Sequence, residues 1–190
     1  MPTQLRFTIL TLLLPWCILI LHAYYYYPFL SDDALISLRY AQRLLEGQGL
    51  TWTDGIPVEG YSNLLWLLLG AGLGWLHLDL IDSVRLLGLL NMSLVLLANI
   101  YWYQTFFPQS QVFPLVMGQL FFVLAAPVAV WTIGGLEQPL IASLLAWCIV
   151  FTCLILQHAA PRPLWIWLVS TLLGALALTR PDGILFTVII

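Results

Sequence analysis

The chain of 190 residues contains six Lys and Arg residues, nine Asp and Glu residues and 62% apolar residues. Charged residues make up only 8% of it, whereas soluble domains have about 25% charged and about 45–50% apolar residues. A water-soluble globule is therefore excluded, because the apolar surplus must face lipid, and the composition predicts a polytopic membrane protein. All six cations are Arg and they form no basic patch, which excludes a nucleic-acid partner.

The first predicted span covers about residues 7–27 and ends in four consecutive tyrosines at residues 24–27. Arg6 precedes this span, and because positive residues favour the cytoplasmic side, we expect the N-terminus in the cytoplasm. The apolar run has no small-x-small cleavage site, so it is predicted to remain as a span. The tyrosines are typical of an aromatic belt at the lipid headgroups, and a substrate-stacking platform is the alternative.

Residues 28–63 form one long polar segment, which we expect on the extracytoplasmic side. Five of the nine acids lie in it, namely Asp32, Asp33, Glu46, Asp54 and Glu59. Apolar residues recur at helical spacing between residues 34 and 45, which predicts a short amphipathic helix lying on the membrane. Ser31 is the expected N-cap of this helix, and Gly47 is expected to begin the turn that ends it.

Residues 64–76 are apolar, but as a helix they would be only about 20 Å long, against a hydrocarbon core of about 30 Å. We therefore predict an interfacial or re-entrant helix here. Gly70, Gly72 and Gly74 lie within it. They favour close helix packing over a nucleotide-binding loop, because no strand precedes them.

Four further spans are predicted, at about residues 84–107, 112–133, 139–156 and 164–178, which makes five with the first. If residues 64–76 do not cross the membrane, Glu137 and Arg180 face outward together with the acidic loop. If they do cross, both side chains move to the cytoplasmic side and Arg162 moves outside, which the positive-inside rule disfavours. Because the chain stops within an apolar run, we expect it to be the N-terminal part of a longer protein whose remainder is missing.

The adjacent carboxylates of Asp32 and Asp33 are the sharpest candidates for chemistry, since charges are scarce at a membrane surface. Such a pair can supply a general base or bind a divalent cation. The alternative is that the two acids only cap the helix that begins with them. The cysteines and histidines have no partners at metal-ligand spacing, which indicates neither a disulfide framework nor a zinc site.

Polar or aromatic residues at three other places each have a functional and a structural interpretation. Residues 59–63 combine an acid, two hydroxyls and an amide, which suits a sugar or phosphate, although Ser62 or Asn63 could simply cap the next helix. Trp52 offers a face for a sugar ring or an interfacial anchor. Arg180 can bind a phosphate bidentately or pair with Asp182.

Four segments together resemble a known family. They are residues 31–49 (SDDALISLRYAQRLLEGQG), 58–66 (VEGYSNLLW), 131–137 (WTIGGLE) and 178–183 (LTRPDG). In this order they are similar to motifs of the arabinofuranosyltransferase B-like integral membrane proteins, which belong to the GT-C class of glycosyltransferases. The resemblance covers nearly the whole chain. One departure is Gln138, where family members often have Thr.

The resemblance implies an all-α, GT-C-like transmembrane protein in the bacterial cytoplasmic membrane. Such an enzyme transfers a sugar from a polyprenyl-phosphate-linked donor to a cell-envelope glycan or glycolipid acceptor, on the extracytoplasmic face and with inversion. An acid of the first loop acts as the base and cations stabilise the leaving phosphate. No cofactor is implied with certainty, and a divalent cation would be bound by the same aspartates. Carried over by residue, the catalytic positions are Asp32 and Asp33, with the choice of base left open. The substrate contacts are Arg39, Glu59, Tyr61, Asn63, Glu137 and Arg180, with Arg39 and Arg180 toward the phosphate.

Two other functions compete with a glycosyltransferase. Half of a transporter or flippase would place carboxylates near the middle of spans, whereas every acid here lies in a loop or at a span edge. A non-catalytic membrane subunit gives no reason for paired aspartates in a concentrated acidic loop. The sequence therefore favours the enzyme, and it identifies neither the sugar nor the acceptor.

Overall fold

The computed structural model describes residues 9–54, 58–108 and 111–189. All regular structure in these ranges is helical, as predicted. A short π-helical segment η1 (Ile9–Leu13) leads into α2. The α-helices in chain order are α2 (Leu14–Tyr25), α3 (Asp32–Leu45), α4 (Leu64–Trp75), α5 (Leu80–Phe106), α6 (Val112–Leu124), α7 (Ala126–Ile133), α8 (Gln138–Gln157), α9 (Pro163–Thr179) and α10 (Gly183–Ile189).

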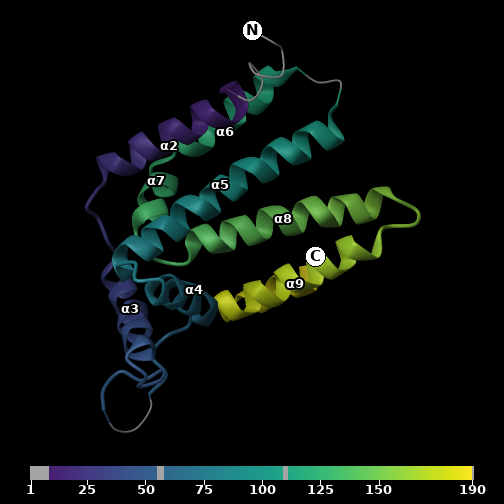
Figure 1. Cartoon of the computed structure of the whole chain (residues 1–190). Coiled ribbons are helices and arrows are strands. Elements are labelled where there is room, and N and C mark those ends of the chain that lie inside the picture. The colour runs from purple at the N-terminus through teal and green to yellow at the C-terminus, as the bar shows by residue number, and fades with distance from the viewer. Residues whose placement is uncertain (1–8, 55–57, 109–110, 190) are drawn as a thin grey trace.

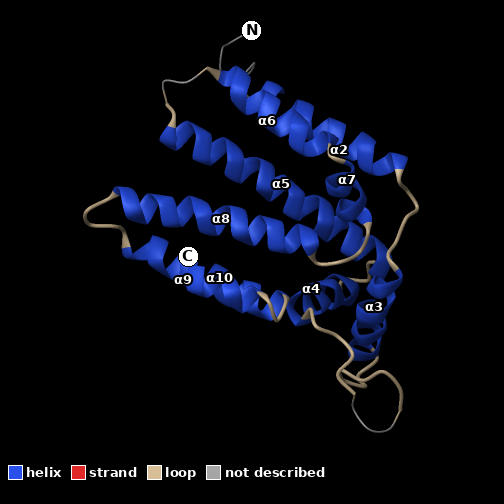
Figure 2. Cartoon of the chain, turned by 180° about the vertical axis from the view of Figure 1, so that it is seen from behind, coloured by secondary structure: helices blue, strands red, loops and turns tan. Residues whose placement is uncertain are grey.

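The long helices lie side by side in a bundle. Helix α5 packs against α8, and α8 packs against α9, while α2 packs against α6 on the other side of α5 (Figures 1 and 2). The short helices α3 and α4 pack against each other at one end of the bundle, where α5 and α8 begin and α9 ends (Figure 1). The end of α5, the start of α6 and the loop between α8 and α9 lie at the opposite end (Figure 1).

The sequence predicts five spans, and the structure supports fewer. Only α5 and α8, among the described helices, are long and apolar enough to cross a membrane alone. Helices α6 and α7 would make a third span if counted together, but they are bent by 61° at the break between them. Pro127 in the first turn of α7 explains the break, because its ring cannot continue a preceding helix. The helix over Leu10–Tyr25 and helix α9 are shorter than a span, and residues 7–8 of the first predicted span lie outside the described residues.

The outer surface of the bundle is apolar, which fits a membrane protein. Large side chains such as Phe121, Leu156 and Trp167 are 72–79% exposed. Inside, a cluster of Leu19, Met92, Val95, Leu96 and Val123 joins α2, α5 and α6. A second cluster of Leu38, Trp66, Val84, Leu87 and Leu140 lies where α3, α4, α5 and α8 meet, and it supports the polar residues described below.

The predicted interfacial segment 64–76 is the helix α4, which lies beside α3 at the same end of the bundle (Figure 1). Its glycines behave unequally. A Cβ at Gly74 would lie 2.7 Å from Leu45 and 2.8 Å from Leu80, whereas one at Gly72 would contact nothing. The prediction of close packing therefore holds for Gly74 and is wrong for Gly72.

The ends of α3 follow the sequence in part. Ser31 occupies the predicted N-cap position with extended backbone, but its side chain makes no capping hydrogen bond. Gly47 has a φ of +76°, a left-handed conformation that glycine adopts without strain and that commonly ends a helix. This turn after α3 begins where the sequence predicts it.

Candidate functional site

A cavity of about 390 Å³ opens at the end of the bundle where α3, α4, α8 and α9 meet. It is lined by Asp33, Ile36, Ser37, Gly60, Tyr61, Ser62, Asn63, Trp131, Leu136, Glu137, Gln138 and Arg180. Five residues predicted from the sequence are among them, from four separate segments of the chain: Asp33, Tyr61, Asn63, Glu137 and Arg180. We call this cavity the polar pocket.

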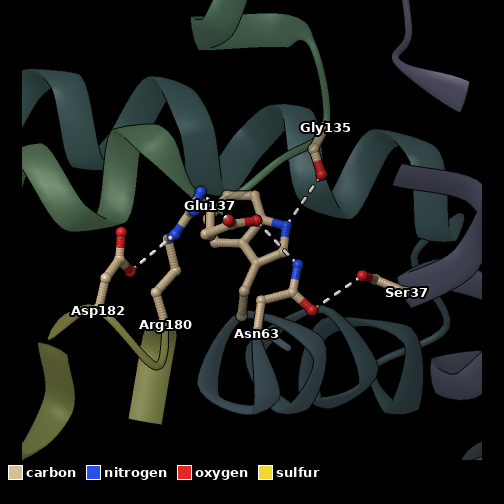
Figure 3. Close-up of polar contacts among 7 residues, drawn as sticks. Ser37, Asn63, Gly135, Glu137, Arg180 and Asp182 are labelled. Carbon is tan, nitrogen blue, oxygen red and sulfur yellow. Dashed lines mark hydrogen bonds and ion pairs between the residues drawn. The ribbon is translucent and has the colours of Figure 1, made fainter. Parts of the chain in front are cut away.

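A buried carboxylate, Glu137, is the centre of the pocket's hydrogen bonds (Figure 3). Its side chain is only 6% exposed. The Nδ2 of Asn63 donates to its Oε2 over 2.8 Å, and the Nη1 of Arg180 lies 3.3 Å from its Oε1. The Ser37 hydroxyl donates to the Oδ1 of Asn63 over 2.9 Å. A buried charge needs such partners, so these four side chains fix one another in place.

The turn before Glu137 is fastened to α3 and α4 through its backbone. The Trp66 indole Nε1 donates to the Gly135 carbonyl over 2.9 Å, and the Ser31 amide donates to the Gly134 carbonyl over 2.9 Å. Gly135 has a φ of +85°, and a Cβ there would lie 2.6 Å from Leu30 and 2.9 Å from Ala34. The motif Gly134–Gly135 thus allows the turn to approach α3 closely.

Arg180 has two acidic partners. Its Nε donates to Asp182 over 3.0 Å, in addition to the contact with Glu137. The hydrogen bond that Arg180 donates to Asp182 raises the pKa of Arg180 above its ordinary value, so this guanidinium stays charged. The pairing with Asp182 that the sequence offered as one interpretation is therefore present, and Arg180 also lines the pocket, while phosphate binding stays a prediction. With a side chain 41% exposed, it is the only cation among the described residues that line this cavity.

The two adjacent aspartates differ in position. Asp33 lines the polar pocket and Asp32 does not. The Oδ1 of Asp32 instead accepts the backbone N–H of Asp33 over 3.1 Å, and both side chains are exposed at the start of α3. Within the described ranges, no group of three or more His, Cys, Asp and Glu side chains is placed to hold a metal ion. The aspartate pair is therefore not part of a larger set of ligands there.

Two other residues predicted as substrate contacts lie outside the cavity lining. Arg39 donates through Nε to the Trp52 carbonyl over 3.4 Å, and Glu59 is exposed. This contact holds Arg39 against the segment that follows α3, outside the cavity lining. Trp52 packs against the Tyr40 ring at 5.8 Å and is not among the residues that line this pocket.

Tyr61 is held in the pocket wall by aromatic packing. Its ring meets that of Tyr40 edge-on at 4.9 Å, and burial raises the pKa of Tyr61 above 10.0. The Tyr40 hydroxyl donates to the Val58 carbonyl over 2.6 Å and accepts the Gly60 N–H over 3.0 Å. The polar segment is thus folded back onto α3 beside the pocket.

Sequence reasoning missed Ser37, Trp131 and Gln138 as lining residues. Helical periodicity gives a signal for Ser37, because it lies four residues after Asp33 and hence on the same face of α3. Trp131 lies in the segment WTIGGLE, and Gln138 follows Glu137 directly. Their types alone did not distinguish them from core or helix-start residues.

Neither a protein-family model nor a solved structure matches the chain. One curated protein is similar to it, the terminal beta-(1->2)-arabinofuranosyltransferase of Mycobacterium tuberculosis (strain ATCC 25618 / H37Rv), with 26% identity over 162 residues. These residues make up 80% of this chain and 26% of the relative. The chain therefore spans about a quarter of the length of the curated relative it matches, and the similarity supports a distant relationship to a glycosyltransferase.

Proposed function

We propose that this chain is part of a membrane glycosyltransferase that transfers a sugar from a polyprenyl-phosphate-linked donor to a glycan or glycolipid acceptor of the bacterial cell envelope. The observation that carries the proposal is the polar pocket, where an exposed carboxylate, a half-exposed guanidinium and a buried network converge at one end of an apolar bundle. The similarity to an arabinofuranosyltransferase supports the same reaction class. An arabinofuranosyl donor is therefore the first probe to use.

The proposed orientation places the polar pocket on the extracytoplasmic face of the cytoplasmic membrane, with the N-terminus inside. Residues 28–63, 134–137 and 180–182 then face outward together. The contacts that join Asn63, Glu137 and Arg180 support the placement of these segments on one side. A lipid-linked donor can reach such a site from within the bilayer, while a glycan acceptor approaches from water.

The proposed step is a displacement with inversion at the anomeric carbon. The acceptor hydroxyl oxygen forms a bond to that carbon from the face opposite to the phosphate. The bond between carbon and phosphate oxygen breaks, and its electron pair leaves with the lipid phosphate. The Asp33 carboxylate takes the proton of the acceptor hydroxyl, and Arg180 stabilises the charge on the departing phosphate. We assign Asp33 as the base over Asp32, because only Asp33 lines the pocket.

The test measures transfer of radiolabelled arabinofuranose from a polyprenyl-phosphate donor, using membranes of cells that express the complete gene. The rate of the original protein is compared with the rates of its variants. Loss of a general base lowers a rate by about 10²–10⁴-fold, so we expect a fall of this order in Asp33→Asn. Asp32→Asn should stay within a few-fold of the original rate. Glu46→Gln, an exposed acid at the other end of α3, is the matched control and should be unchanged.

Undiminished transfer by Asp33→Asn would remove this mechanism. A large loss in Asp32→Asn alone would reverse the assignment of the base. The transporter alternative has no specific support, because Glu137, the buried carboxylate of the site, lies at the start of α8 and not near its middle.

A further inference from the structure

Gln138, the first residue of α8, is a pocket-lining amide that the proposed mechanism does not use. Its Oε1 is buried without a hydrogen-bond partner. Its Nε2 also makes no hydrogen bond to any described residue. An unsatisfied buried carbonyl destabilises a folded protein, so an amide kept in this state calls for a functional explanation.

The neighbouring polar groups are already engaged with one another. The Oδ1 of Asn63 accepts a hydrogen bond from Ser37, and its Nδ2 donates one to Glu137. Both carboxylate oxygens of Glu137 accept hydrogen bonds, from Asn63 and from Arg180. Within the part of the chain that the structure describes, no other buried side-chain atom of the pocket lining lacks a partner. Gln138 is therefore the lining residue whose whole amide is free for a ligand.

The backbone of Gln138 is fixed while its amide can turn. Pro139 follows it in the first turn of α8, and the Ile141 N–H donates to the Glu137 carbonyl over 3.0 Å. The terminal torsion of a glutamine side chain is broad. Either the oxygen or the nitrogen of the amide can therefore be turned to the cavity without moving α8.

The chemistry of an amide selects its ligand. A neutral amide offers one acceptor and one donor group, which matches a hydroxyl because a hydroxyl also donates and accepts. A phosphate ester anion only accepts hydrogen bonds, so it would leave the amide oxygen unpaired, and Arg180 is the cationic group that suits it. Trp131, which also lines the pocket, has a flat apolar ring of the kind on which a sugar ring packs.

We propose that Gln138 is a sugar-binding residue, which hydrogen-bonds a hydroxyl of a sugar bound in the polar pocket and makes no contribution to binding the lipid phosphate. This proposal rests on the proposed glycosyltransferase function. The hydroxyl belongs either to the donor sugar or to the acceptor sugar, and the two are separated by experiment.

The experiment uses the complete gene product, purified in detergent, with two lipids: farnesyl phosphate and farnesyl-phosphoryl-arabinofuranose. Gln138→Met keeps the length of the side chain and removes the amide. Losing one hydrogen bond should weaken binding about fivefold to tenfold, and this loss is expected for the lipid that carries the sugar. Binding of farnesyl phosphate should not change. Gln157→Met, at the exposed far end of the same helix, is the matched control and should behave like the original protein.

If the hydroxyl belongs to the acceptor, both lipids bind Gln138→Met normally, and the KM for an arabinofuranosyl disaccharide acceptor rises by the same factor in the transfer assay. Equal weakening of both lipids would show a structural role and overturn the proposal. So would an unchanged affinity for the sugar-bearing lipid together with an unchanged acceptor KM. If the original protein binds neither lipid and transfers no sugar, the proposed function itself fails. If only the proposal for Gln138 fails, the proposed glycosyltransferase function still stands.

Discussion

The polar pocket and the rest of the helical bundle are held together in different ways. At the polar pocket, side chains far apart in sequence are joined by directional hydrogen bonds, as between Asn63 and Glu137 or between Trp66 and Gly135. Along the bundle, hydroxyls such as those of Thr105, Ser170 and Thr171 bond to carbonyls four residues earlier in their own helices. These bonds do not tie one helix to another.

The difference shows what sets the position of each region. In the bundle, the relative placement of helices depends mainly on shape, most clearly where α5 crosses α7 at Gly88. A few hydrogen bonds also join its helices, as from the Gln119 Nε2 to the Leu96 carbonyl and from the Ser143 hydroxyl to Asn91. At the pocket, it depends on particular atoms that satisfy the buried charge of Glu137. A change of side-chain volume should therefore damage the first region most, and loss of one polar atom should damage the second.

The largest effect is expected from Gly88→Ala in the bundle. A Cβ at this position would overlap the backbone carbonyl oxygen of Thr132, and backbone cannot move aside as a flexible side chain can. Overpacking typically costs about 1–3 kcal/mol, and a backbone clash should reach about 3 kcal/mol. The measurement is the free energy of unfolding in detergent.

Gly174→Ala in α9 is the matched control, since a Cβ there would contact nothing within 4 Å. It should stabilise the protein by about 0.5–1 kcal/mol, because alanine favours a helix more than glycine does. Equal effects of the two substitutions would show that shape does not set the crossing of α5 and α7.

A smaller effect is expected from Asn63→Ala at the pocket. It removes the donor to the buried Glu137 and the acceptor of Ser37. A hydrogen bond to a charged group contributes about 1.5–3 kcal/mol, and we expect a loss of about 2 kcal/mol in unfolding free energy.

Ser143→Ala gives the comparison within the bundle, where the Ser143 hydroxyl donates to the neutral Asn91 between α8 and α5. Hydrogen bonds between membrane helices average about 0.6 kcal/mol, so this loss should be about a third of that at Asn63. If Ser143→Ala lowers the free energy of unfolding more than Asn63→Ala does, the proposed contrast between the bundle and the polar pocket is wrong.

The sequence predicts the members of the pocket better than it predicts the spans. Parity of the apolar runs places Asn63, Glu137 and Arg180 at one end of the bundle, and their contacts agree with that placement. The count of five spans depends on straight helices. Hydropathy alone does not show that Pro127 divides one apolar run into α6 and α7.

Motif matching also fails to show which way a side chain points. Arg39 and Glu59 lie within segments that contribute to the pocket, yet neither side chain lines it. Ser37 and Gln138 do line it. The position of Ser37 four residues after Asp33 is a signal for the same face of α3, whereas a helix-start glutamine carries no distinctive signal. Only the packing at the start of α8 reveals Gln138.

The smallest effect on stability is expected from an ion pair near the polar pocket that is exposed to water. The Nη2 of Arg43 lies 2.6 Å from Asp54, whose side chain is 90% exposed. The hydrogen bond and charge of Arg43 lower the pKa of Asp54 below 3.8. Because the folded pKa is the lower one, this pair stabilises the protein above the unfolded pKa, and the contribution is lost as pH falls through the folded value.

Thermal unfolding in detergent should therefore show a small, constant difference in Tm between the original protein and Asp54→Asn at pH 5–7. The difference should shrink below pH 3.8, where Asp54 of the unfolded chain is already protonated. Exposed ion pairs are weak because water screens them. This difference in Tm should therefore be smaller than the fall in Tm that Asn63→Ala causes. A larger one would mean that burial of Glu137 is not what makes the contacts of the pocket strong.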